Sequence, residues 1–256
     1  AVSLTKIMTK LTDCKYRIGL TGTLDDSKTH KLVLQGLFGT VNRVVSTKQL
    51  IDKKQLAQLK VMCLNLKYPE VEAKKVYGVK YFEELEYLTQ NTARNKYIRN
   101  LALALKGNTL LLFQLVEKHG EILFNLIKEK ADPKRKVFFV YGGTETDDRE
   151  KIRAITEKSD NAIIVASFGT FSTGINIRNL HNIVFSSPTK SPIRVLQSIG
   201  RGLRVGDKKD SATVYDISDD LTYKDKKNFT LTHFQERVGI YNREGFNYEI
   251  HTVELK

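Results

Sequence analysis

The sequence has little cysteine and no long apolar run. Of its 256 residues only Cys14 and Cys63 are cysteines, and they lack the close spacing of a metal-binding pair. We expect no metal site and two ordinary reduced, buried thiols. No segment reaches the ~18 apolar residues of a membrane span, and no signal peptide is recognisable. These absences predict a cytoplasmic protein. The first residue is not Met, so we expect the chain to be cut from a longer one.

Acidic residues are in the minority. Lys and Arg number 42 against 29 Asp and Glu, which gives a net charge of +13 and a pI near 9.5. Such a balance favours a polyanionic partner, with nucleic acid first among them. The alternative is a soluble protein with spare lysines.

Apolar runs alternate with helical patterns from about residue 108 onward. The runs lie at 109–114, 136–142, 162–167, 181–187 and 212–218, and helices are predicted at 117–130, 147–158 and from Ser191, with Asp147 as a cap. This alternation is typical of an α/β fold with a parallel sheet between helix layers. Outside it we expect helices at 3–11, 83–105 (two) and 228–243, and strands at 16–23, 59–68 and 247–255.

Polar residues follow each expected strand. Because parallel strands end at one edge, these residues should share a rim where ligands bind. They are Gln114, Gly142, Gly143, Thr144, the hydroxyl-rich segment 167–176, Ser186 and Ser187. Hydroxyls and exposed backbone N–H groups are good phosphate ligands. An ordinary strand-to-helix loop is the alternative for 167–176.

The stretch "SPIRVLQSIGRGLR" (191–204) is unusual for a helix. Its spacing places Gln197, Arg201 and Arg204 on one face, while Gly200 and Gly202 weaken the helix. Like charges and glycines both reduce stability, so a functional demand is indicated. A solvated basic face is the alternative.

Four segments resemble motifs of the superfamily 2 nucleic-acid helicases. "QSIGRGLR" is similar to their Q-x-x-G-R-x-x-R motif, "IIVASFGTFSTGIN" to motif V, "TLLLFQ" to motif IV and "LTGTL" to motif III. Order and spacing agree over residues 16–218. Within the family the sequence resembles the phage recombination and repair helicases, and this likeness includes the tail "EGFNYEIHTVEL". This likeness implies DNA, in branched recombination or repair intermediates, and the host cytosol as its location.

The resemblance implies a RecA-like sheet that closes on ATP and Mg²⁺ held by a preceding RecA-like domain. It assigns Arg201 and Arg204 as arginine fingers, with Gln197 beside them. Nucleotide contacts fall on Gly174, Asn176 and Gly200, and Asn176 stands where many relatives have Asp. Nucleic-acid contacts fall on Ser167, Thr170, Gln114, Gly143 and Arg149; for Arg149, pairing with a nearby acid is the alternative. The resemblance also assigns Thr21, Gly22 and Thr23 the role of linking the state of the bound ATP to the nucleic-acid groove.

The sequence lacks two elements that the family carries before motif III. It contains neither the phosphate loop G-x-x-x-x-G-K-[ST] nor an acidic box. We therefore expect 1–45 to be the end of a first RecA-like domain, 46–107 a linker strand and helices, 108–218 the second RecA-like domain, and 219–256 a C-terminal helix and strand. Two functions remain: the C-terminal part of an ATP-dependent DNA helicase, inactive as an ATPase alone, or a non-catalytic RecA-like module that binds nucleic acid or protein.

Overall fold

The chain forms two units, residues 1–46 and 47–256. The computed structural model describes residues 2–21, 28–42, 44–174, 177–188, 195–196, 198–200 and 211–255. The first unit contains the helices α1 (Val2–Met8) and α2 (Lys28–Phe38). The helix predicted at 3–11 is thus confirmed, although it ends at Met8.

The strand predicted at 16–23 is wrong for its described part, because residues 16–21 form no strand. Tyr16, Ile18 and Leu20 alternate along this segment and are exposed by 74%, 80% and 94%. A strand needs a neighbour to satisfy its backbone groups, and no strand of the described residues pairs with this segment. This segment has the alternating apolar residues of a strand, but no strand among the described residues pairs with it in a sheet.

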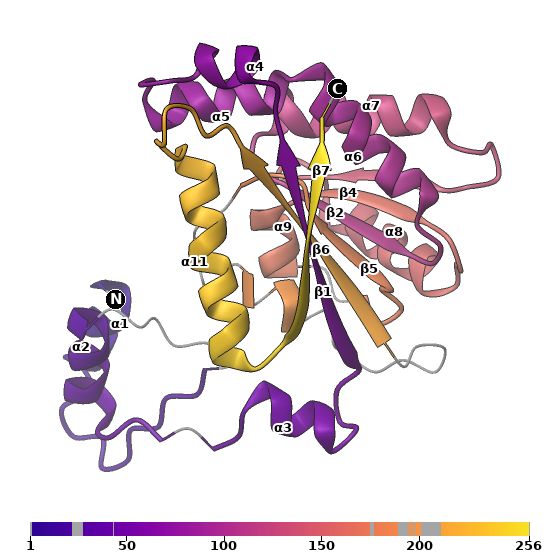
Figure 1. Ribbon diagram of the computed structural model, residues 1–256. Helices are drawn as coiled ribbons and strands as arrows, with labels where there is room; N and C mark the ends of the chain where they lie inside the picture. The colour runs from indigo at the N-terminus through magenta and orange to yellow at the C-terminus, as the bar shows by residue number, and fades with distance from the viewer. Residues whose placement is uncertain are drawn as a thin grey trace. The chain divides into compact units, whose positions relative to one another are not determined.

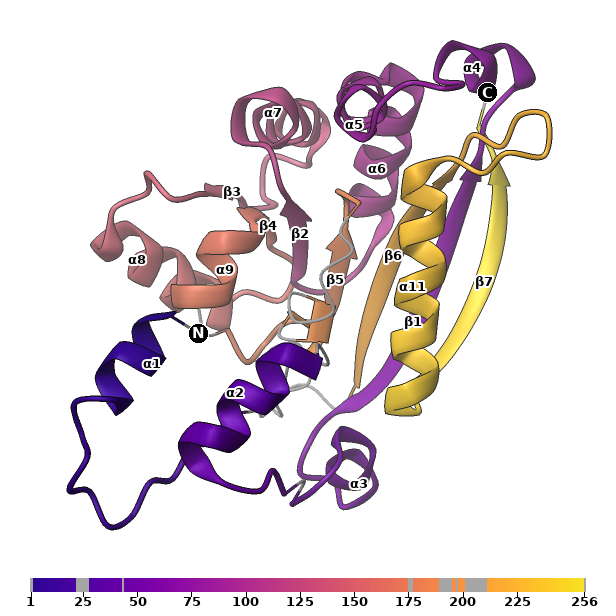
Figure 2. The ribbon, with the colours of Figure 1, turned by 90° about the vertical axis from the view of Figure 1, so that its left-hand side faces the viewer.

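The second unit is built on a parallel sheet, whose strands can be followed in Figures 1 and 2. Its order is β3-β4-β2-β5-β6-β1-β7, and every pair is parallel. The strands are β1 (Gln58–Lys67), β2 (Thr109–Phe113), β3 (Val137–Val140), β4 (Ile163–Ser167), β5 (Asn182–Phe185), β6 (Ser211–Asp220) and β7 (Asn247–Glu254). The α/β class and the predicted strands from 59 onward are therefore confirmed. β1 and β7 lie in the same sheet as the strands of 108–218.

Helices cover both faces of this sheet (Figures 1 and 2). They are α3 (Thr47–Asp52), α4 (Glu70–Lys75), α5 (Tyr81–Gln90), α6 (Thr92–Ala104), α7 (Glu121–Lys130), α8 (Thr146–Glu157), α9 (Phe168–Gly174) and α11 (Phe229–Glu244). A π-helical turn, Val116–Gly120, precedes α7. Its Gly120 is required, because a Cβ there would come within 2.6 Å of the Phe113 ring.

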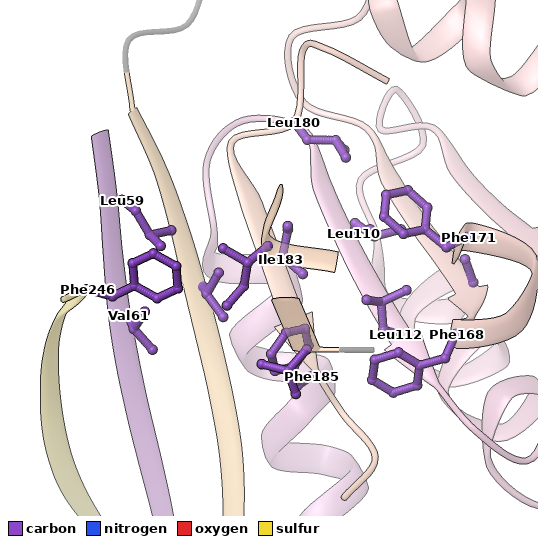
Figure 3. Close-up of a cluster of buried hydrophobic side chains, with 14 of the residues drawn as sticks. Leu59, Val61, Leu110, Leu112, Phe168, Phe171, Leu180, Ile183, Phe185 and Phe246 are labelled. Atoms are coloured by element: carbon purple, nitrogen blue, oxygen red, sulfur yellow. The ribbon is translucent and has the colours of Figure 1, made fainter. Parts of the chain in front are cut away.

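The core has two layers because neighbouring residues of a strand face opposite sides. Leu110 and Leu112 of β2 point toward α9 and α11, whereas Leu111 and Phe113 point toward α5, α6 and α7. Figure 3 shows the first layer, in which Phe168 and Phe171 of α9 lie beside side chains of β2 and β5. All of these residues are at most 3% exposed. Burial on both faces explains why the strands are continuous apolar runs.

Three local predictions need correction. Glu145, not Asp147, is the N-cap residue of α8, and it makes no side-chain capping bond. Residues 168–174 form helix α9 rather than a loop. Cys14 is exposed, whereas Cys63 is buried as predicted, and burial followed by the charge of Asp216 raises the pKa of its thiol. No helix in the described part of the chain is long and apolar enough to cross a membrane.

Candidate nucleic-acid interface

The predicted rim is formed by the carboxyl ends of β2, β3, β4 and β5. Since these strands are all parallel and adjacent, the residues that follow them lie along one edge of the sheet. Gln114, Gly142 and Gly143 are exposed on this edge, whereas Ser186 and Ser187 are buried. The rim therefore has a solvent-facing row with a buried polar row behind it.

Ser167 and Thr170 act as a pair at the end of β4. The Ser167 Oγ lies 2.8 Å from the Thr170 Oγ1 and accepts a hydrogen bond of 3.3 Å from the Thr170 backbone N–H. Ser167 is half-buried, but Thr170 is only 5% exposed. Thus Ser167 is the hydroxyl that a ligand can reach, and Thr170 orients it.

Arg149 holds the loop between β3 and α8. Its Nε donates to the Thr144 carbonyl at 2.8 Å and its Nη2 to the Gly142 carbonyl at 2.9 Å. No ion pair of Arg149 with an acid forms among the described residues. A Cβ at Gly143 would come within 2.7 Å of the Tyr141 ring. Asp147 and Asp148 stand in the first turn of α8, where their charges disfavour a phosphate.

A buried hydrogen-bonded chain supports Gln114 from behind. The Gln114 N–H donates to the Ser187 Oγ at 3.1 Å, and that oxygen lies 2.9 Å from the His119 Nδ1. The His119 Nε2 lies 3.5 Å from the Arg94 Nη1. Burial, and then the charge of Arg94, hold the pKa of His119 well below its ordinary value. The ring is therefore neutral, with Nδ1 as the donor to Ser187 and Nε2 facing the guanidinium.

Arg94 and Asp219 anchor this chain in the protein interior. Both side chains are fully buried; the Arg94 Nε and Nη2 donate to the two Asp219 oxygens at 2.8 and 3.1 Å. The Arg94 Nη2 also donates to the Ser186 carbonyl at 2.9 Å, and the Tyr68 hydroxyl donates to Asp219 at 2.8 Å. Burial alone lowers the pKa of Arg94, but Asp219 raises it above its usual value. The pair ties α6, β6 and the end of β5 together.

Sequence reasoning missed this buried set. Arg94 could have been found, because Arg94, Ile98 and Ala102 stand four residues apart and all face the core of the sheet unit. An arginine on an apolar stripe indicates a buried partner. Nothing in the sequence marks His119 as its neighbour.

The residues predicted to face ATP lie mostly outside the described ones. This applies to Gln197, Arg201, Arg204 and Asn176, and also to Gly22 and Thr23 of the coupling motif. Thr21 is described and exposed, and Gly174 ends α9. Gly200 is exposed, and a Cβ there would meet no atom of the described residues within 4 Å. Val195, Ser198 and Ile199 are buried.

The parallel sheet and its polar rim define the class of protein, and comparison with known families agrees. Residues 93–206 match the helicase conserved C-terminal domain. This segment carries the helicase C-terminal domain, and the similarity of the chain to superfamily 2 helicases extends beyond it.

Individual relatives are similar to this chain beyond residues 93–206. The chain is 37% identical to the ATP-dependent DNA helicase uvsW of Enterobacteria phage T4, over 99% of this chain and 52% of the relative. It is similar to the crystal structure of T4 UvsW with a TM-score of 0.68 and 33% identity, covering 100% of this chain and 52% of that one. It is 24% identical to the putative ATP-dependent helicase IRC3 of Saccharomyces cerevisiae, over 66% of this chain and 24% of the relative. An ATP-dependent Type ISP restriction-modification enzyme, LlaBIII, shares the fold, with a TM-score of 0.60 and 15% identity over 95% of this chain and 18% of that one. The chain thus spans about half the length of the phage relative, and less of the others.

Proposed function

We propose that this chain is the C-terminal portion of an ATP-dependent DNA helicase or translocase. It supplies one side of a nucleic-acid groove and the arginine fingers of an ATP site whose phosphate loop and Mg²⁺ ligands belong to a preceding RecA-like domain. The observation that carries the proposal is the common edge: Gln114, Gly143 and Ser167 lie at the carboxyl ends of three adjacent parallel strands. Backbone phosphates, spaced regularly, suit such a row of hydroxyl, amide and N–H groups.

The exposed segment 16–20 supports a preceding domain. Tyr16, Ile18 and Leu20 present alternate apolar side chains to solvent, which is the pattern of a strand without its sheet. A preceding RecA-like domain would provide that sheet and would bring the Thr21 motif to the interface. A stand-alone binding module has no use for such a segment.

The ATP chemistry assigned to this chain is electrostatic. Phosphoryl transfer spreads negative charge over the transferred group, and guanidinium groups that arrive on closure stabilise it. Arginine suits this role because its charge is permanent and its donors form a planar fork. The sequence contains neither a phosphate loop nor an acidic box, and for that reason we assign the Mg²⁺ ligands to the preceding domain.

We propose DNA as the substrate because the chain is 37% identical to the DNA helicase of phage T4. Branched recombination and repair intermediates, and a cytosolic location, are proposed from the same likeness. Contacts to phosphates do not distinguish DNA from RNA. Competition between forked DNA, a DNA strand and an RNA strand of one sequence tests this part. A preference for forked DNA supports it, and a preference for RNA contradicts it.

Binding of nucleic acid to this chain should be weak and strongly salt-dependent. Arg149→Ala is expected to reduce the slope of log K against log salt by about 0.7 to 0.9, because one phosphate contact is lost. Ser167→Ala should lower affinity up to about ten-fold without changing the slope, since it removes an uncharged donor. Fluorescence anisotropy at several salt concentrations measures both.

The matched control is Arg153→Ala. Arg153 lies on the same helix as Arg149, has the same charge and pairs with Glu150 at 2.6 Å. It should leave the slope unchanged. A flat salt response of the parent chain, or equal effects of the two arginine variants, would contradict the rim as the binding site.

A further inference from the structure

A cavity of about 310 Å³ lies beyond the carboxyl end of β6, on the same edge of the sheet as the rim but lined by other residues. It lies between the loop Val76–Val79 after α4 and the segment that leads from β6 into α11. Figures 1 and 2 both show that segment beside α4 and α5. No predicted site residue lines it. Its size suits one planar ring system, at the lower end of the range of ligand pockets.

The wall of this cavity is fixed by Glu84 of α5. Its carboxylate is 1% exposed and accepts hydrogen bonds from the Phe229 and Thr230 N–H groups at 2.9 and 2.8 Å. It also accepts from the Thr230 hydroxyl at 2.8 Å and the Asn228 amide at 2.9 Å. The start of α11 is thereby clamped to α5, and Phe229 is held at the mouth. The charge of Glu84 is used inside the wall and does not face a ligand.

Aromatic rings are exposed around this cavity and hardly elsewhere. Among the described residues of 47–255, the exposed aromatic side chains are Tyr77, Phe82 and Phe229, at 47%, 77% and 45%. Tyr77 and Phe229 line the cavity, and Phe82 lies outside it. Tyr81 contacts Phe229 edge to face, with ring centroids 6.1 Å apart. Solvent-exposed rings held in place by the fold indicate a surface that receives a partner.

The two segments that border this cavity are rich in lysine, although its lining carries two lysines and two glutamates. Residues 74–80 and 222–229 contain six lysines and one acidic residue, Asp225. Lys226 lies 5.6 Å above the Tyr77 ring, and both Lys226 and Lys227 line the cavity and are exposed. Glu236 is the remaining acidic residue of the lining. Exposed rings beside lysines are the combination that binds single-stranded nucleic acid, because bases stack and phosphates pair with the charges.

We propose that this cavity is a second nucleic-acid site, which takes a base of a single strand against Tyr77 and Phe229 and the neighbouring phosphates on Lys226 and Lys227. It is distinct from the rim and does not depend on the ATP-site assignment. In a branched substrate it would hold one separated strand while the rim holds another. The structure thus offers two sites whose chemistry differs: stacking at one and backbone contacts at the other.

The test compares a fluorescein-labelled dT12 strand with a strand of equal length that carries abasic sites. The parent chain should bind dT12 about five-fold or more tightly than the abasic strand, since stacking is lost in the latter. Phe229→Leu and Tyr77→Leu should lose that preference, and Phe229→Tyr should retain it. The Lys226→Ala, Lys227→Ala double variant should weaken binding of both strands.

Matched controls separate this site from general charge and from misfolding. Phe82→Leu makes the same exchange outside the cavity, and Lys128→Ala with Lys130→Ala removes the same charge at the end of α7. Both should bind like the parent. Melting temperatures check folding, which the exposed rings should barely affect. The proposal is overturned if the parent binds both strands equally, or if Phe229→Leu and Tyr77→Leu keep the parent's preference. Either result leaves the salt-slope test of the rim unaffected.

Discussion

Arg201→Ala is expected to lower kcat for DNA-stimulated ATP turnover by about 10³-fold or more in a protein that joins this chain to a RecA-like domain with a phosphate loop. A finger acts on charge that develops in the transition state, so its loss appears in kcat rather than in ground-state binding. DNA affinity and melting temperature should stay close to those of the parent. Arg201 stands outside the described residues, so this expectation rests on the motif and its chemistry.

Further variants of the same motif sharpen this test. Arg201→Lys should recover little activity, because the charge remains but the fork geometry is lost. Arg204→Ala should resemble Arg201→Ala, and the double variant should be far less than additive, since both serve one closed state. Arg153→Ala removes an exposed arginine elsewhere and should leave kcat unchanged. Near-normal kcat for Arg201→Ala, or a lowered melting temperature with kcat preserved, would reject the finger assignment.

Arg94→Ala is expected to lower the free energy of unfolding of the sheet unit by about 3–5 kcal/mol. The change leaves the Asp219 carboxylate buried without its cation and removes the donor to the Ser186 carbonyl. It also removes the guanidinium that faces His119. Urea unfolding followed by circular dichroism measures the loss, which should be apparent in the midpoint without a large change in slope.

The control for this prediction is Lys118→Ala. Lys118 pairs with Glu86 at 2.6 Å, but the two side chains are 57% and 49% exposed, so the loss should stay below about 1 kcal/mol. Arg94→Met together with Asp219→Leu should recover much of the stability, since neither charge is then left unpaired. An Arg94→Ala loss no larger than that of Lys118→Ala would show that the buried pair does not anchor the rim.

The central strands could be predicted from the sequence because both of their faces are buried. Runs such as Leu110–Phe113 must be apolar throughout, and few other structures place such short runs between helices. The segment 168–174 was harder. Its glycine, serine and threonine indicate a loop, yet Phe168 and Phe171 stand three apart and both are buried. Their packing against the sheet outweighs the weak helix propensity of the other residues.

The buried ion pairs behind the site could not be predicted, because they depend on contacts between segments that are distant in the sequence. Arg94 and Asp219 are 125 residues apart, and Arg237 makes a similar buried pair with Asp216 at 2.8 Å. In the sequence each of these residues is indistinguishable by type from an exposed charge. For the two arginines, a position on an apolar helical stripe indicates burial, as for Arg237 between Phe234 and Tyr241.

Steady-state phosphate release tests the central claim most directly, measured on this chain alone and on the chain joined to a RecA-like domain that carries a phosphate loop and an acidic box. The account predicts that the chain alone turns over no ATP above background, with or without DNA. It also predicts that the joined protein has turnover that DNA stimulates and Arg201→Ala abolishes. DNA-stimulated turnover by this chain alone, unchanged in Arg201→Ala, would contradict the claim that it carries only half of the ATP site.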